Sequence, residues 1–301
     1  MKIFIIYIAL FFLNIIVYGQ NDGIIINGNA KIFYRTYGKG TPILIINGGP
    51  GMNSDGFVNL AVMLSKNNKT IIYDQRGTGR STVENPDSLN ITMKLMVSDI
   101  ECLRKNLKID QWIILGHSFG GMLASYYATF YPEHILGMIL SSSGGIDLSL
   151  LDNVRNSIDS KLTQRELDEI KYWGEKIENG DTSHYAKLQR GKALAAAYVY
   201  NKKNIPIIAE RLTQGYPLIT NLVWQDLQRI KFDCSEKLST FNKPVLIIQG
   251  KQDIVGKDLA EKAHKVLRNS KLVFLNKCVH YGWLDRPDEY FKEINKFLQS
   301  I

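Results

Sequence analysis

The stretch Trp112-Ile113-Ile114-Leu115-Gly116-His117-Ser118-Phe119-Gly120-Gly121 decides how this chain folds. A short apolar run, typical of a buried strand, leads directly into the pattern G-x-S-x-G, and a helical pattern follows. Glycines on both sides of Ser118 permit a sharp turn, because the tight backbone leaves no room for side chains there. The turn exposes the serine hydroxyl at the N-terminus of a helix, where developing negative charge is favoured. An α/β fold with a nucleophilic serine is therefore predicted, and the alternative is a packed glycine turn with an incidental serine.

Other short apolar runs alternate with helical patterns, which is typical of a mostly parallel sheet with helices on both faces. The runs are continuous, as expected for strands buried on both sides. The further parallel strands are expected at 43–46, 70–73, 138–140, 245–248 and 272–275. Segments 23–26 and 31–37 predict an antiparallel hairpin at one edge, which brings the sheet to eight strands. Helices are expected at 92–107 and 119–131.

Helical segments replace the strands from about residue 147 to residue 238. Thr163-Gln164-Arg165-Glu166 is a capping box, 193–200 is rich in strong helix formers, and 220–230 has helical periodicity. We therefore predict a helical cap at 147–237, inserted between two parts of the core at 20–146 and 238–301.

Residues 1–19 have the pattern of a secretory signal peptide: one basic residue, an apolar stretch of about 15 residues, and small residues before Gln20. The stretch is shorter than the about 20 apolar residues that span a bilayer. We expect cleavage after Gly19, a secreted or periplasmic product, and no membrane attachment after cleavage.

The formal net charge is +8, but the basic residues are scattered among acidic ones and form no block. This pattern argues against a nucleic-acid partner. The expected partner is the small-molecule or short-peptide substrate of the chemistry below, and the oligomeric state is left open. The three cysteines lack metal-ligand spacing, so no metal is expected. A Cys234–Cys278 disulfide is left open. No cofactor is needed, because the chemistry below uses protein groups alone.

A serine nucleophile needs a base and a group that orients the base. His280 follows the expected strand 272–275 near the C-terminus, the position at which the chain order serine, acid, histidine places the base. Asp253 follows the strand 245–248, at the sheet edge where functional groups gather. Asp147, which follows the preceding strand, is the alternative acid. The predicted triad is Ser118, Asp253 and His280.

An oxyanion formed on the substrate needs two preorganised N–H donors. Phe119, directly after the nucleophile, supplies the first. Asn47-Gly48-Gly49-Pro50-Gly51 follows an early strand, and its glycines allow the backbone to approach the substrate. We predict Gly49 as the second donor, with Gly48 as the alternative.

The loops at 48–51 and 74–81, the serine turn at 116–121, and the residues Asp253 and His280 together resemble the proline iminopeptidase branch of the α/β-hydrolases. The resemblance spans the whole core. It implies the α/β-hydrolase fold, the same triad and oxyanion donors, and a cap that closes over the site and selects substrate. Within 74–81 we expect Asp74 and Arg76 to pair and to brace the surrounding loops.

The resemblance implies an aminopeptidase that releases N-terminal residues from small peptides through an acyl-enzyme. The tryptophan- and glutamate-rich cap segment of such enzymes is not recognisable at 193–203, so Glu210, Trp224 and Asp226 are the candidate substrate-binding residues. A carboxylesterase or lactonase is the alternative, expected to have a pocket lined by apolar residues such as Trp173, Tyr198, Tyr200 and Trp224. A non-catalytic binding protein on the same fold is a remote third.

Overall fold

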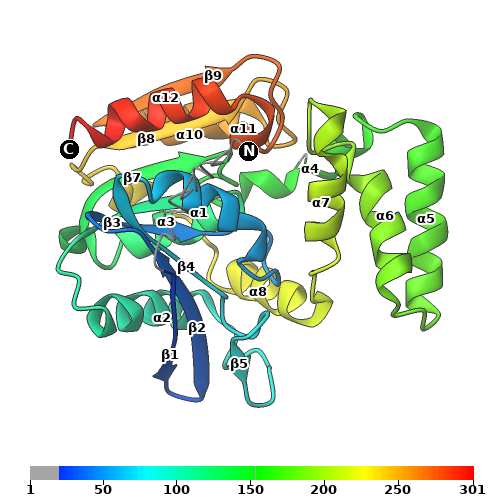
Figure 1. Ribbon diagram of the computed structural model, residues 1–301, viewed down its shortest axis with the longest axis horizontal. Helices are drawn as coiled ribbons and strands as arrows, with labels where there is room; N and C mark the ends of the chain where they lie inside the picture. Colours follow the sequence, from blue (N-terminus) through cyan, green and yellow to red (C-terminus); the bar gives the residue numbers. More distant parts are fainter. Residues whose placement is uncertain (1–19, 153) are drawn as a thin grey trace, which may run out of the picture.

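A single mixed sheet forms the centre of the protein (Figure 1), in a computed structural model that describes residues 20–152 and 154–301. The expected signal peptide at 1–19 lies outside the described residues. The strand order is β1-β2-β4-β3-β6-β7-β8-β9, and β5 pairs with β2. The strands are β1 Asn21–Asn27, β2 Ala30–Tyr37, β3 Thr41–Ile46, β4 Asn68–Tyr73, β5 Thr82–Val83, β6 Trp112–His117, β7 Ile135–Ser141, β8 Val245–Gly250 and β9 Ser270–Leu275.

The eight expected strands are confirmed. β1 and β2 form the antiparallel edge hairpin, and β4, β3, β6, β7, β8 and β9 run parallel to one another. The two-residue strand β5 was not predicted, because it is too short to show a pattern.

Helices cover both faces of the sheet, as expected. The residues of β6 alternate between the two sides: Ile113 and Leu115 join the apolar cluster under α1 and α12, while Ile114 joins the cluster under α2, α3 and α10. Both faces are therefore buried, which explains the continuous apolar run. These helices are α1 Val58–Leu64, α2 Met93–Asn106, α3 Phe119–Ala128, α10 Lys257–Val266 and α12 Pro287–Leu298, and the short α11 Gly282–Asp285 precedes the last of them.

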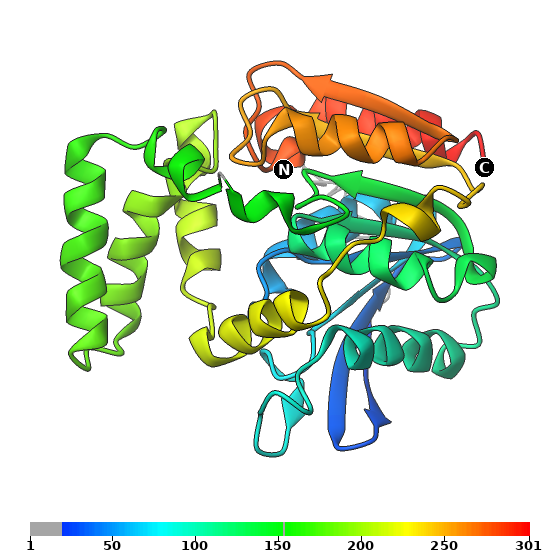
Figure 2. The same ribbon diagram turned by 180° about the vertical axis from the view of Figure 1, so that it is seen from behind.

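The segment between β7 and β8 contains helices and no strand among its described residues. Figures 1 and 2 show α5, α6 and α7 standing beside the sheet, with α5 outermost. The helices are η3 Leu148–Asp152, α4 Val154–Asp159, α5 Gln164–Glu178, α6 His184–Ala195, η4 Lys202–Asn204, α7 Ile205–Leu212, α8 Pro217–Arg229 and α9 Ser235–Leu238. The predicted capping box opens α5, with Thr163 and Glu166 bonded reciprocally.

The expected helix at 193–200 is present only at 193–195: α6 ends at Ala195 and the chain then turns. Tertiary hydrogen bonds hold this turn. The backbone N–H groups of Tyr200 and Asn201 donate to the carboxylate of Asp285 at 2.9 and 3.0 Å, and the carbonyl of Tyr198 accepts from the N–H of His280 at 3.1 Å. Contacts with the core therefore override helix propensity here.

The expected pairing of Asp74 with Arg76 is also wrong, although both side chains are buried. Arg76 forms an ion pair with Asp99 at 2.6 Å. Asp74 accepts from Arg80 at 2.8 Å and from the hydroxyl of Ser54 at 2.6 Å. Two separate pairs therefore brace this region.

No helix in the described ranges is both long enough and apolar enough to cross a membrane.

Candidate active site

Ser118 occupies a strained turn between β6 and α3, with φ 54° and ψ −123°. A Cβ at Gly116 would lie 2.4 Å from the carbonyl oxygen of Gly120, and a Cβ at Gly120 would lie 2.1 Å from that of Ile46. Side chains are excluded at both positions by backbone atoms, which cannot move aside. The close approach of backbone atoms therefore requires glycine at both positions, as the sequence pattern predicts.

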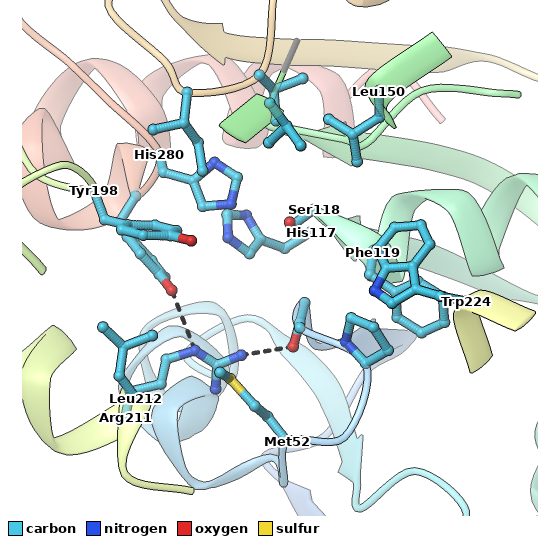
Figure 3. Close-up of a pocket in the computed structure, with 17 residues that line it drawn as sticks. Met52, His117, Ser118, Phe119, Leu150, Tyr198, Arg211, Leu212, Trp224 and His280 are labelled. Atoms are coloured by element: carbon cyan, nitrogen blue, oxygen red, sulfur yellow. Dashed lines mark hydrogen bonds between the residues drawn. The ribbon is translucent and has the colours of Figure 1, made fainter. Parts of the chain in front are cut away.

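Two loops bring His280 and Asp253 together. Asp253 follows β8 and His280 follows β9, and Nδ1 of His280 donates to Oδ1 of Asp253 at 2.8 Å. Both side chains are buried. Because Nδ1 carries the proton in this bond, Nε2 is left as the basic nitrogen. Ser118 and His280 line the same cavity (Figure 3).

The alternative acid, Asp147, does not line this cavity. Its carboxylate pairs with Lys262 and accepts from the backbone N–H of Ser149 at 3.0 Å. Burial acts to raise the pKa of Asp147, but these hydrogen bonds outweigh it and the pKa is lowered. Asp147 thus stays charged in a local ion pair and does not contact His280.

The loop after β3 lies against the nucleophile. A Cβ at Gly48 would lie 2.7 Å from Cβ of Ser118, and Gly49 has φ 69°, in the left-handed region. The N–H of Gly49 bonds no backbone acceptor of the described residues. The N–H of Phe119 opens α3 and so has no acceptor within the helix. Two N–H groups are therefore available beside Ser118.

The cavity around Ser118 has a volume of about 170 Å³. Apolar and aromatic side chains make up most of its wall. Among the described lining residues, Arg211 is the one arginine, and no lysine, aspartate or glutamate lines the cavity. Figure 3 shows Arg211 and Trp224 on opposite sides of Ser118. The lining residues are Gly48, Gly49, Pro50, Met52, His117, Ser118, Phe119, Leu150, Val154, Tyr198, Arg211, Leu212, Trp224, Ile254, Val255, His280 and Tyr281.

Of the three candidate substrate-binding residues, only Trp224 lines the cavity. Glu210 is largely exposed and lies 3.3 Å from Nε2 of His184. Asp226 is buried, but its carboxylate accepts from the backbone N–H of Met93 at 2.8 Å and from Arg229. Asp226 thus ties α8 to α2. The structure brings neither carboxylate to Ser118.

The expected apolar wall is present in part. Tyr198 lines the cavity with Trp224, whereas Tyr200 is exposed and Trp173 packs between Tyr172 and Tyr185. Arg211 and Tyr281 were not predicted as lining residues. Nothing in the sequence around Arg211 separates it from the other basic residues of the helical segment.

His117 is buried beside His280, with 4.6 Å between the ring centroids, and neither of its ring nitrogens has a partner in the described structure. Burial, assisted by the nearby His280 and Arg211, lowers the pKa of His117 far below its ordinary value. The ring is therefore neutral at pH 7 and adds no charge to the cavity.

Among the described residues, no cluster of three or more histidine, cysteine, aspartate or glutamate side chains is arranged to bind a metal ion. The Cys234–Cys278 disulfide that the sequence left open is not formed, and Cys102 is free as well. Burial raises the pKa of the Cys234 thiol to about 12, so this thiol is protonated at neutral pH.

Residues 41–287 match the family model of the alpha/beta hydrolase fold. The proline iminopeptidase of Thermoplasma volcanium is 29% identical, over 93% of this chain and 97% of its own length. The crystal structure of VinJ superposes with a TM-score of 0.75 at 17% identity, covering 93% of this chain and 98% of the other. The esterase RhEst1 of Rhodococcus sp. ECU1013 gives a TM-score of 0.70 at 18% identity, with the same coverage.

The depressed pKa of His117 predicts a pH-dependent loss of stability. Below pH 6.5 the unfolded chain takes up a proton at this histidine and the folded protein does not, so folding stability falls as the pH falls. The slope approaches about 1.4 kcal/mol per pH unit only well below pH 6.5, because the unfolded histidine is half protonated at 6.5; the change between pH 6.5 and 5.5 is about 1 kcal/mol. We expect the stability of the wild type relative to His117→Phe, measured by urea unfolding, to decrease by about 1 kcal/mol between pH 6.5 and 5.5. A difference that stays constant from pH 8 to 5.5 would contradict this.

Proposed function

The chain belongs to the alpha/beta hydrolase family, and we propose that it is a serine hydrolase in which Ser118 is the nucleophile, His280 the base and Asp253 the orienting acid. The observation that carries this proposal is the 2.8 Å hydrogen bond from Nδ1 of His280 to Asp253, beside a serine held on a strained turn.

In the proposed reaction, Nε2 of His280 takes the proton of the Ser118 hydroxyl while Oγ bonds to the substrate carbonyl carbon. The carbonyl oxygen becomes negatively charged and accepts from the N–H groups of Gly49 and Phe119. The intermediate then collapses, and the leaving group takes the proton from Nε2. Water attacks the acyl-Ser118 in the same way, with His280 again as base, and releases the acid product.

We propose carboxylic esters with an uncharged, compact acyl group as the substrate class. The cavity is small and mostly apolar, and its charged lining residue is a cation. Because an ammonium group buried there would lie near Arg211 without a carboxylate partner, its burial is costly. This favours the esterase or lactonase alternative over an aminopeptidase.

Proline iminopeptidase activity is the second candidate, and the specific observation in its favour is the 29% identity to the Thermoplasma volcanium proline iminopeptidase over most of both chains. Such an activity needs a group that holds the free amine of the substrate. Glu210 and Asp226 remain the proposed carboxylates for it, but each has another partner in the present structure.

A fluorophosphonate should label Ser118, because an activated hydroxyl attacks phosphorus as it attacks a carbonyl carbon. We expect labelling to disappear in Ser118→Ala and to slow by on the order of 10³-fold or more in His280→Ala. Peptide mapping by mass spectrometry gives the labelled residue. Undiminished labelling of Ser118→Ala would rule out this nucleophile.

The two acids should differ sharply in importance. Asp253→Asn should lower kcat by on the order of 10⁴-fold, because an asparagine at this position favours the wrong tautomer of His280. Asp147→Asn is the matched control and should change kcat by less than about tenfold, since Asp147 contacts Lys262 and not His280. Ester hydrolysis measures both, and the reverse order would move the acid to Asp147.

A matched pair of substrates separates the two candidate functions. The p-nitrophenyl esters of cyclopentanecarboxylic acid and of proline have similar shapes, and only the proline ester carries a ring ammonium. After correction for spontaneous hydrolysis, we expect kcat/KM to be about 100-fold higher for the cyclopentane ester, because its acyl group needs no carboxylate partner. A preference for the proline ester would instead support the aminopeptidase candidate.

A further inference from the structure

Arg211 is buried in the wall of the cavity and forms no ion pair with any described carboxylate. Only 3% of the surface of Arg211 is exposed, and the residue lies on helix α7 of the cap. A buried charge without a counter-ion is costly, so other contacts must stabilise the guanidinium of Arg211.

Apart from a bond to Tyr281, the contacts of Arg211 are with the segment that follows β3. Nη2 donates to the carbonyl oxygen of Gly48 at 2.7 Å, and the guanidinium lies over the ring of Phe57, 4.7 Å from its centroid. Nε donates to the hydroxyl of Tyr281 at 3.2 Å. A Cβ at Gly56 would lie 2.9 Å from Cδ of Arg211, so the loop has a glycine where the arginine side chain passes. The dashed lines in Figure 3 mark the bonds to Gly48 and Tyr281.

The carbonyl of Gly48 belongs to the same peptide unit as the N–H of Gly49. In a trans peptide the C=O and the N–H point in opposite directions, so a donor that fixes the oxygen also fixes the direction of the N–H. A cationic donor on the oxygen also polarises the unit and makes its N–H a stronger donor. The side chain of Asn47 donates to the same oxygen at 3.2 Å, but it is neutral and its bond is longer.

We propose that Arg211 is a positioning residue that holds and polarises the Gly48–Gly49 peptide, so that the N–H of Gly49 stabilises the oxyanion only when the cap is docked on the core. This rests on the proposed hydrolase function and adds a role for the cap in forming the catalytic site. Arg211 lies on α7, whereas Ser118, Phe119 and Gly49 belong to the core, so this contact makes the oxyanion hole depend on both parts.

The test uses a neutral ester, the p-nitrophenyl ester of cyclopentanecarboxylic acid, so that no charge on the substrate can interact with Arg211. Arg211→Met should lower kcat by on the order of 10- to 100-fold, less than the loss expected when an oxyanion donor is removed outright, and should change KM by less than about threefold. Arg211→Lys keeps a cationic donor and should recover part of the loss. Arg165→Met, an exposed arginine of α5, is the matched control and should behave as wild type.

An inhibitor that forms the oxyanion gives the readout that a purely structural role would not change. The affinity of an alkyl trifluoromethyl ketone, which adds to Ser118 and carries the negative oxygen, should fall across the Arg211 variants in parallel with kcat/KM. The affinity of cyclopentanecarboxamide, an uncharged analogue of the acyl group, should stay within about threefold, because it forms no oxyanion.

The inference would be overturned if kcat were unchanged in Arg211→Met, or if kcat/KM fell only because KM rose. Ser118 labelling in the wild type would still support the hydrolase in either case. If Arg211→Met does not fold, as judged by circular dichroism, Arg211→Lys and Arg211→Gln provide the same comparison. A Gln variant as active as the Lys variant would also overturn the inference, because the proposed polarisation of the peptide requires the positive charge. Absence of Ser118 labelling in the wild type would instead remove the proposed function itself.

Discussion

Backbone-to-backbone contact at Gly116 and Gly120 is the constraint on which the site depends. The first turn of α3 presses so closely on β6 and on the end of β3 that no Cβ fits at either glycine. The same contact forces Ser118 to φ 54° and places the N–H of Phe119 at the open end of the helix. Ile46 and Gly120, far apart in sequence, are thus held in backbone contact, above strands that the β3–β6 ladder joins. The buried strands on either side hold the turn rigidly and offset the cost of its strain.

The loops that complete the site are held by hydrogen bonds between the core and the cap. The N–H of His280 donates to the carbonyl of Tyr198, and Asp285 accepts from the N–H groups of Tyr200 and Asn201. The turn that follows α6 is therefore packed directly behind His280. Its conformation and the position of the histidine are set by one network, so the cap is part of the site's framework as well as its cover.

The sequence was a good guide where local pattern and sterics decide the structure. Apolar runs and glycine spacing predict the strands and the serine turn. They also place Asp253 and His280 after neighbouring strands, and the structure joins these two residues by a 2.8 Å hydrogen bond.

The sequence was a poor guide where tertiary contacts decide the structure. The segment after Ala195 has helix-forming residues, yet it turns because Asp285 and His280, about 80 residues away, bind its backbone. The partners of Asp74, Arg76 and Asp226 could not be predicted for the same reason, since a charged residue in a sequence does not indicate which distant partner it will reach.

The most informative case is the charge in the cavity. The sequence predicts carboxylates that would hold a substrate amine, but the described cavity wall has Arg211 and neither Glu210 nor Asp226. In the proposed reaction, positive charge develops on His280 while negative charge develops on the substrate oxygen. Asp253 bonds the ring of His280, where positive charge develops. Arg211 bonds the peptide whose N–H faces the substrate oxygen, where negative charge develops. Each developing charge therefore lies near a fixed charge of opposite sign. Because both fixed charges are buried and held in place before substrate binds, they need little reorganisation when the charges form, which is the condition under which electrostatic stabilisation of a transition state is strongest.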